Sequence, residues 1–112
     1  MRLKGKVALI TGAGSGFGEG IAQRFSEEGA NVAIIDINPE AGQRVANGID
    51  NSLFVEADVA NSASVKNMVS KTIETFGGLD ILVNNAGITH RNQPMLEVDE
   101  KTFDRIFAVN VK

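Results

Sequence analysis

The sequence has 112 residues, 43% of them hydrophobic, which is enough for one domain with a buried core and too short for two domains. Its 11 basic and 14 acidic residues give a net charge of -3, so we expect no basic surface for nucleic acid or anionic lipid. The absence of cysteine excludes disulfides and cysteine-bound metals in this stretch, and no apolar run approaches the roughly 18 residues of a membrane span. These features predict a cytoplasmic globular domain with no nucleic-acid, membrane or metal partner.

Short apolar runs rich in β-branched residues alternate with amphipathic helical patterns, and this order is typical of a parallel α/β sheet. The runs predict four strands, over residues 6–10, 32–35, 53–57 and 81–83. The first run is apolar throughout, as expected for a strand that is covered on both faces. The sequence therefore predicts parallel strands connected by helices.

Amphipathic patterns with one apolar stripe predict three helices, over residues 17–28, 39 to about 46, and 61–76. Asn38 and Asn61 are placed to act as N-caps, and Pro39 follows the first of them at a position that favours proline. Gly29 and Gly77 are placed to end the first and the third of these helices.

A fourth helix is predicted to begin near Asp99. Its apolar stripe would contain four residues: Phe103, Ile106, Phe107 and Val111. No stop signal follows this pattern before Lys112, so we expect the helix and the domain to continue in a longer chain. The preceding residues 88–97 contain Pro94 and have little periodicity, which predicts a loop.

The alternation of strands and helices matches the first half of a Rossmann-type, doubly wound α/β fold. Right-handed crossovers would place the strands in the spatial order 3-2-1-4 and would leave the fourth strand without an outer neighbour. In such sheets ligands bind beyond the carboxyl ends of the strands, where the strand order reverses. Four marked segments follow strand ends in this chain: residues 11–18, Asp36, Asp58-Val59 and residues 84–87. Their convergence at one edge predicts a binding site.

Residues 11–18 form a glycine-rich turn between the first strand and the first helix. Glycine allows the backbone to turn sharply, and the helix that follows presents unpaired N–H groups and its positive dipole end. An anionic group such as a pyrophosphate fits at this place. The alternative is a tight connection that binds nothing, but the entropic cost of its glycines favours a ligand.

Asp36 follows the second strand, where its carboxylate could accept two hydrogen bonds from the ribose hydroxyls of an adenosine. A 2′-phosphate in that place would meet like charge, and neither Ser15 nor Ile37 offers it a cation. The sequence therefore predicts NAD rather than NADP as cofactor. The alternative is that Asp36 is a solvated loop residue.

The glycines do not meet the strict G-x-G-x-x-G fingerprint. They fit the form T-G-x-x-x-G-x-G, read at Thr11, Gly12, Gly16 and Gly18. Together with the pair Asp58-Val59 and the run N-N-A-G at residues 84–87, this form resembles the short-chain dehydrogenase/reductase family over the whole chain. The combination is specific, whereas each motif alone would be weak.

The resemblance implies an oxidoreductase whose glycine turn binds the pyrophosphate of a nicotinamide dinucleotide. The implied contacts in the turn are Gly12, Ser15, Gly16, Phe17 and Gly18. Asp58 and Val59 would flank the adenine, although Asp58 could instead begin an ordinary turn. Asn85, Ala86 and Gly87 would line the cofactor cleft, although the asparagines could merely cap a strand end.

The resemblance also implies that Asn110 is the helix asparagine of the family's catalytic tetrad. The other members, a serine and a Tyr-x-x-x-Lys pair, lie further along the longer chains of the family, and this sequence contains no tyrosine. We therefore expect one dinucleotide-binding domain over residues 1–112 that is inactive alone, with a carbonyl or alcohol substrate site elsewhere and a homo-oligomer when complete. The alternative is a stand-alone dinucleotide-binding or interaction module, but the open edge expected on the fourth strand favours a longer enzyme.

Overall fold

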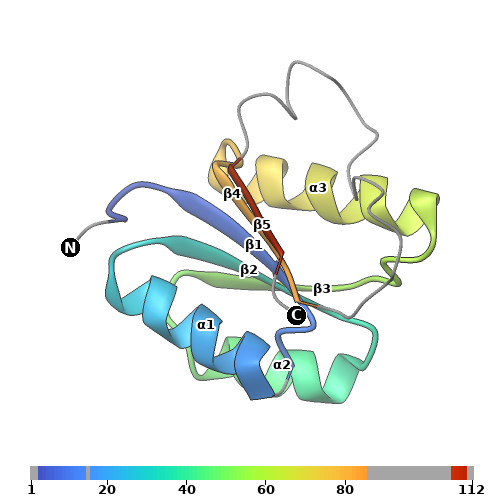
Figure 1. The fold of residues 1–112 in the computed structure, drawn as a ribbon, viewed down its shortest axis with the longest axis horizontal. Coiled ribbons are helices and arrows are strands. Elements are labelled where there is room, and N and C mark those ends of the chain that lie inside the picture. Colours follow the sequence, from blue (N-terminus) through green and yellow to red (C-terminus); the bar gives the residue numbers. More distant parts are fainter. Residues whose placement is uncertain (1–2, 15, 86–106, 111–112) are drawn as a thin grey trace.

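The computed structural model describes residues 3–14, 16–85 and 107–110 (Figure 1). Within these residues a parallel sheet is flanked by helices on both sides. The strands are β1 (Val7–Thr11), β2 (Asn31–Asp36), β3 (Ser52–Glu56), β4 (Ile81–Asn84) and β5 (Phe107–Asn110). The helices are α1 (Gly16–Glu27), α2 (Pro39–Asn47) and α3 (Ser62–Phe76).

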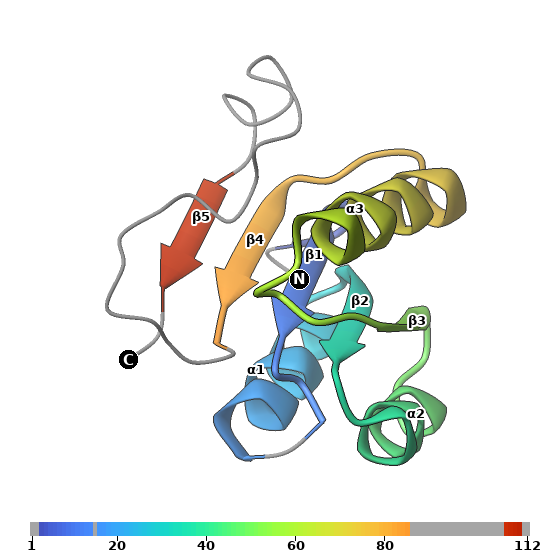
Figure 2. The same cartoon turned by 90° about the vertical axis from the view of Figure 1, so that its right-hand side faces the viewer.

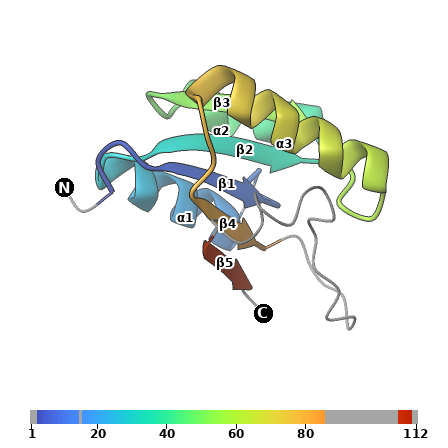
Figure 3. The ribbon, with the colours of Figure 1, turned by 90° about the horizontal axis from the view of Figure 1, so that it is seen from above.

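The strands lie side by side in the order β3-β2-β1-β4-β5, and every pair in the sheet is parallel (Figure 3). This order confirms the predicted arrangement 3-2-1-4. The predicted bounds of these four strands and of α1, α2 and α3 each fall within one residue of the observed bounds. Because all strands run the same way, their carboxyl ends and the loops that follow them share one edge of the sheet.

Helices α1 and α2 cover one face of the sheet and α3 covers the other (Figure 2). Successive strand residues point to opposite faces. Leu9 and Ile35 therefore pack in the cluster under α3, whereas Ile10 and Ile34 pack in the cluster under α1 and α2. All four side chains are fully buried, which explains why these strands are apolar throughout instead of alternating. No helix in the described part of the chain is long and apolar enough to cross a membrane.

The predicted helix caps are confirmed. The side chain of Asn38 accepts a hydrogen bond from the Ala41 N–H at 3.1 Å, and that of Asn61 accepts one from the Ser64 N–H at 3.0 Å. Gly77 ends α3 in the left-handed region, with φ 85°, which a residue without a Cβ adopts at no steric cost. A side-chain cap at Asn61 and the backbone conformation of Gly77 therefore set the two ends of α3.

The prediction of a helix after Asp99 is wrong where the structure describes that segment. Phe107–Asn110 forms β5 and pairs with β4, so β4 does have an outer neighbour and is not the open edge that we expected. The physical reason is that Phe-Ala-Val is an apolar, β-compatible run, and pairing satisfies the outer backbone groups of β4. Phe103, Ile106 and Val111 lie outside the described residues, so the remainder of this prediction stays a prediction.

Candidate cofactor-binding site

Three of the predicted segments meet at the carboxyl edge of the sheet. β1 lies between β2 and β4, so the glycine turn after Thr11 is flanked by the end of β2 and the end of β4. The Ala13 N–H donates to the Ile35 carbonyl at 3.1 Å, which holds the start of the turn against β2. The backbone register also places Asn110 opposite Asn84 at this same edge. The fold thus brings together residues that are far apart in the sequence.

The glycine turn needs glycine at specific positions. Gly12 and Gly16 have φ values of 63° and 59°, in the left-handed region that residues with a Cβ rarely adopt. Gly18, in the first turn of α1, is buried, and a Cβ there would collide with the Gly12 carbonyl oxygen and would lie 2.8 Å from the Ala13 Cα. The turn and the start of α1 are therefore in backbone contact, and this contact leaves the helix N-terminus directed at the turn.

A buried hydroxyl joins the turn to the end of β4. Thr11 Oγ1 accepts a hydrogen bond from the Asn85 N–H at 2.9 Å and lies 3.3 Å from Asn84 Oδ1, to which it can donate. Asn85 Nδ2 in turn donates to the Gly12 carbonyl at 3.3 Å. Thr11 and Asn84 were read as parts of motifs but not as site residues. The structure shows that they hold the predicted site residue Asn85 against the glycine turn.

Asp36 contacts the turn through its carboxylate. Its Oδ2 accepts a hydrogen bond from the Gly14 N–H at 2.8 Å, and its Oδ1 accepts one from the Asn38 N–H at 2.9 Å. A Cβ on Gly14 would lie 2.6 Å from Oδ2, so only glycine permits this approach. An ionised carboxylate has about four acceptor positions. Asp36 is thus oriented by two backbone donors and keeps the capacity to accept further hydrogen bonds.

Asp58 and Val59 follow β3 at the same edge of the sheet. Asp58 Oδ1 accepts a hydrogen bond from the Ala60 N–H at 2.9 Å, and the Asp58 carbonyl accepts one from the Asn61 N–H at 2.9 Å. The Asp58 carboxylate therefore stabilises its own turn, as the alternative interpretation anticipated. Val59 packs against the cluster under α3. Their placement next to an adenine stays a prediction.

The structure describes some of the remaining predicted site residues and leaves others outside the described ranges. Phe17, at the start of α1, is 76% exposed and its ring is open to a ligand or to solvent. Asn110 lies in the strand β5, whereas the resemblance had implied a helix, and its role in catalysis stays a prediction. Ser15, Ala86 and Gly87 lie outside the described residues.

Sequence reasoning missed a side chain that reaches the turn from α2. Arg44 Nη2 donates a hydrogen bond to the Gly14 carbonyl at 3.0 Å and lies 3.3 Å from Glu19 Oε1 on α1. No local spacing rule connects Gly14 with Arg44, since the two are 30 positions apart and meet only through the packing of α2 beside the turn. Neither Ser15 nor Ile37 supplies a cation, but Arg44 brings one to the turn from α2.

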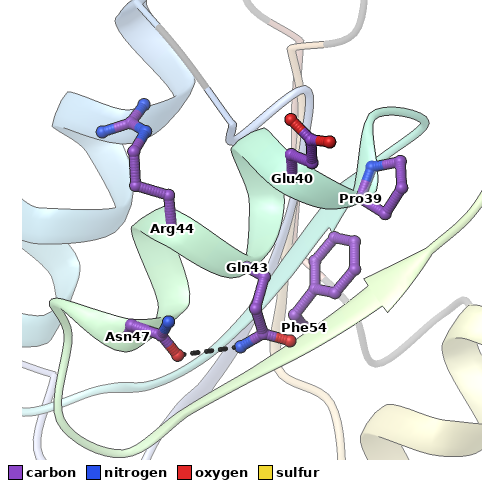
Figure 4. A pocket seen from close by; sticks show the side chains of 6 residues that line it. All are labelled: Pro39, Glu40, Gln43, Arg44, Asn47 and Phe54. Atoms are coloured by element: carbon purple, nitrogen blue, oxygen red, sulfur yellow. Dashed lines mark hydrogen bonds between the residues drawn. The ribbon is translucent and has the colours of Figure 1, made fainter.

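A separate hollow of about 660 Å³ lies between α2 and β3 (Figure 4). Its lining consists of Pro39, Glu40, Gln43, Arg44, Asn47 and Phe54. None of these was predicted to bind a cofactor, and a Cβ on Gly42 would collide with the Phe54 ring. The close approach of Gly42 and Phe54 explains how α2 packs on β3. Figure 4 shows Arg44 directed away from Phe54, toward α1.

Known proteins resemble this chain in sequence and in fold. The sequence profile of the family described as short chain dehydrogenase matches residues 6–112. Secoisolariciresinol dehydrogenase from Forsythia intermedia is 50% identical, in a match that covers 98% of this chain and 41% of the relative. An uncharacterized oxidoreductase from Thermotoga maritima is 49% identical, in a match that covers 100% of this chain and 45% of the relative.

Solved structures agree with the sequence comparisons. The crystal structure of a 3-ketoacyl-(acyl-carrier-protein) reductase from Brucella melitensis complexed with NADH superposes with a TM-score of 0.75 at 52% identity, covering 93% of this chain and 43% of that one. A short chain dehydrogenase/reductase from Burkholderia phymatum in complex with NAD gives a TM-score of 0.75 at 35% identity, covering 79% and 33% of the two chains.

The chain therefore spans less than half the length of the relatives that it matches. What it shares with them is the Rossmann-type region, in a family match that starts just before β1, includes the glycine turn and continues past β4 to residue 112. On the family match, the close relatives and the common fold, this chain belongs to the short-chain dehydrogenase/reductase family of oxidoreductases.

Proposed function

We propose that these residues form the NAD(H)-binding part of an enzyme that transfers hydride between the nicotinamide and a carbonyl or alcohol substrate. The observation that carries the proposal is the geometry of Asp36, whose carboxylate is fixed against the glycine turn by two backbone N–H groups. It ends the strand next to β1 with acceptor positions to spare. This is the place where a dinucleotide-binding fold holds the adenosine ribose.

The preference for NAD over NADP follows from charge at this place. A 2′-phosphate on the ribose would approach the Asp36 carboxylate in a half-buried site, where repulsion between like charges is stronger than in water. The nearby cation, Arg44, is held by the Gly14 carbonyl and by Glu19, and Glu19 offsets its charge. The charges of Asp36, Arg44 and Glu19 around the turn thus favour a neutral ribose hydroxyl over a 2′-phosphate.

The glycine turn fits the pyrophosphate of such a cofactor. A Cβ at Gly14 would meet the Asp36 carboxylate and one at Gly18 would meet the Gly12 carbonyl, so glycine at both positions keeps the turn packed tightly between Asp36 and α1. Helix α1 has 12 residues, and its first N–H groups have no partner within the helix. Gly12, Ser15, Gly16, Phe17 and Gly18 are the residues that we assign to this part of the cofactor.

The other proposed contacts rest on family membership and position in the sequence. Asp58 and Val59 would flank the adenine. Asn85, Ala86 and Gly87 would line the cleft toward the nicotinamide ribose. We also propose, on the same basis, that Asn110 belongs to the catalytic machinery.

When bound, the nicotinamide supplies or accepts the hydride, and a general acid or base must move the accompanying proton. The chain has no tyrosine, so in the proposed enzyme the family's tyrosine, lysine and serine come from residues beyond these 112. We propose that the 112 residues alone turn over no substrate, and that the complete protein is a cytoplasmic homo-oligomer that acts on a small molecule.

The proposal is tested with the full-length protein that contains these residues. Titration calorimetry measures NADH binding without any knowledge of the substrate, and a panel of alcohols with NAD, or of carbonyl compounds with NADH, then tests turnover. We expect NADH to bind and at least one compound to react, while the 112-residue segment shows no turnover with the same compound. Absence of NADH binding to the folded full-length protein would contradict the proposal.

A further inference from the structure

The Gly14 segment is held from two sides. On one side the Gly14 N–H donates to Asp36 Oδ2 at 2.8 Å, and on the other side the Gly14 carbonyl accepts a hydrogen bond from Arg44 Nη2 at 3.0 Å. These two groups belong to consecutive peptide planes, so together they fix the orientation of the backbone before and after Gly14. Gly14 has no Cβ to restrict that orientation by itself.

The Arg44 side chain is held in place by Glu19. Glu19 Oε1 lies 3.3 Å from Arg44 Nη2, and the Glu19 side chain is only 28% exposed. Glu19 is in the first turn of α1, close to the glycine turn, while Arg44 is in the last turn of α2. The pair therefore connects α1, α2 and the glycine turn at one point.

We propose that Arg44 is a positioning residue for the cofactor: it orders the glycine turn and keeps Asp36 aligned for the ribose without touching the cofactor itself. This inference rests on the proposed function. Without Arg44, the Gly14 carbonyl would lose this hydrogen-bond donor, and the orientation that Arg44 holds would have to be established on binding. Ordering a backbone opposes binding, so the affinity for the dinucleotide falls.

The chain provides a matched control. Arg24 on α1 forms an ion pair with Glu28 at 3.2 Å, and the Arg24 side chain is 70% exposed, compared with 3.3 Å and 61% for Arg44 with Glu19. Arg24 lies near the opposite end of α1 from the glycine turn. The two ion pairs are similar in length and exposure, but Arg24 pairs with Glu28 directly after its own helix α1, whereas Arg44 joins α2 to α1 and also donates to a carbonyl of the turn.

The experiment compares Arg44→Met and Arg24→Met in the full-length protein, because methionine keeps the aliphatic part of the side chain and removes the guanidinium. Calorimetry gives the Kd for NADH, steady-state kinetics gives KM and kcat, and thermal unfolding gives the Tm. We expect Arg44→Met to raise the Kd and KM by roughly three- to tenfold with kcat unchanged, since the contact is partly exposed. We expect Arg24→Met to change the Kd and the KM by less than about twofold.

The outcomes separate the inference from the function on which it rests. If the wild-type protein binds no NADH, the proposed function fails and not this inference alone. If the wild-type protein binds NADH and the two variants bind it equally well, Arg44 has no positioning role. A loss that is larger for NADPH than for NADH would mean that Arg44 contacts a 2′-phosphate directly, and this too would overturn the proposal.

Discussion

The two edges of the sheet use an aspartate in different ways. At the amino edge, Asp80 Oδ2 accepts a hydrogen bond from the Val7 N–H at 2.9 Å, and the Asp80 N–H donates to the Val7 carbonyl at 2.9 Å. At the carboxyl edge, Asp36 also accepts backbone hydrogen bonds, but from the loop residues Gly14 and Asn38. The first aspartate joins the starts of two strands, and the second joins a strand end to the turn that we assign to the cofactor.

This difference indicates which polar groups support the fold and which support the site. Asp80 and Val7 satisfy each other reciprocally, so removing the carboxylate leaves a strand N–H without its partner. Asp36 holds loops that lie beyond the ends of the strands, where local flexibility affects binding more than it affects the core. Substitutions at the two edges should therefore separate stability from cofactor affinity.

The largest effect is expected at Gly18. In Gly18→Ala the new Cβ would collide with the Gly12 carbonyl oxygen, and a backbone atom cannot move aside as a flexible side chain can. We expect the free energy of NADH binding to become less favourable by about 2–3 kcal/mol, which is a decrease in affinity of roughly 100-fold. The same strain should lower the Tm. Gly20→Ala is the control, because nothing lies within 4 Å of its added Cβ and alanine favours a helix. Similar results for the two variants would contradict the described contact.

The next effect is expected at Asp36. Asp36→Ala removes the proposed ribose acceptor and the partner of the Gly14 N–H, so we expect the Kd for NADH to rise by roughly 10- to 100-fold. The Tm should fall less than in a variant of the amino edge. Calorimetry on the full-length protein measures the first value and thermal unfolding the second. An unchanged Kd would show that Asp36 does not bind the ribose.

The amino edge should give the opposite pattern. Asp80→Ala leaves the Val7 N–H without its side-chain acceptor, and we expect the free energy of unfolding to fall by about 1–3 kcal/mol. The Kd of the folded protein for NADH should change by less than about twofold, because Asp80 lies at the edge away from the glycine turn. Denaturant titration and calorimetry measure the two quantities. A selective loss of affinity at unchanged stability would break the comparison between the edges.

Most of the fold could be predicted because its signals are local. Leu9 and Ile10 belong to a run that is apolar on both faces, and Asn38 and Asn61 cap helices through side-chain bonds to N–H groups three residues ahead. The segment at Phe107–Asn110 was misread because a short apolar run fits a strand or a buried helix equally well. Pairing with β4, which is a tertiary contact, decides between the two.

The candidate site was predicted less completely for a related reason. Motif spacing identified the glycine turn, the end of the second predicted strand identified Asp36, and the fold brings the two into contact through the Gly14 N–H. The contact between Arg44 and the Gly14 carbonyl has no such signal, because it depends on how α2 packs beside the turn. The role of Thr11 was missed because a threonine at a strand end shows no sign, in sequence, of which backbone group it will bind.

The most direct test of the account is the choice between two cofactors. Titration calorimetry on the full-length protein compares NADH with NADPH in the same buffer. With the Asp36 carboxylate at the proposed ribose position, we predict that NADH binds at least about tenfold more tightly than NADPH. Equal affinity for the two cofactors, or tighter binding of NADPH, would contradict the assignment of Asp36 and of the carboxyl edge as an NAD site.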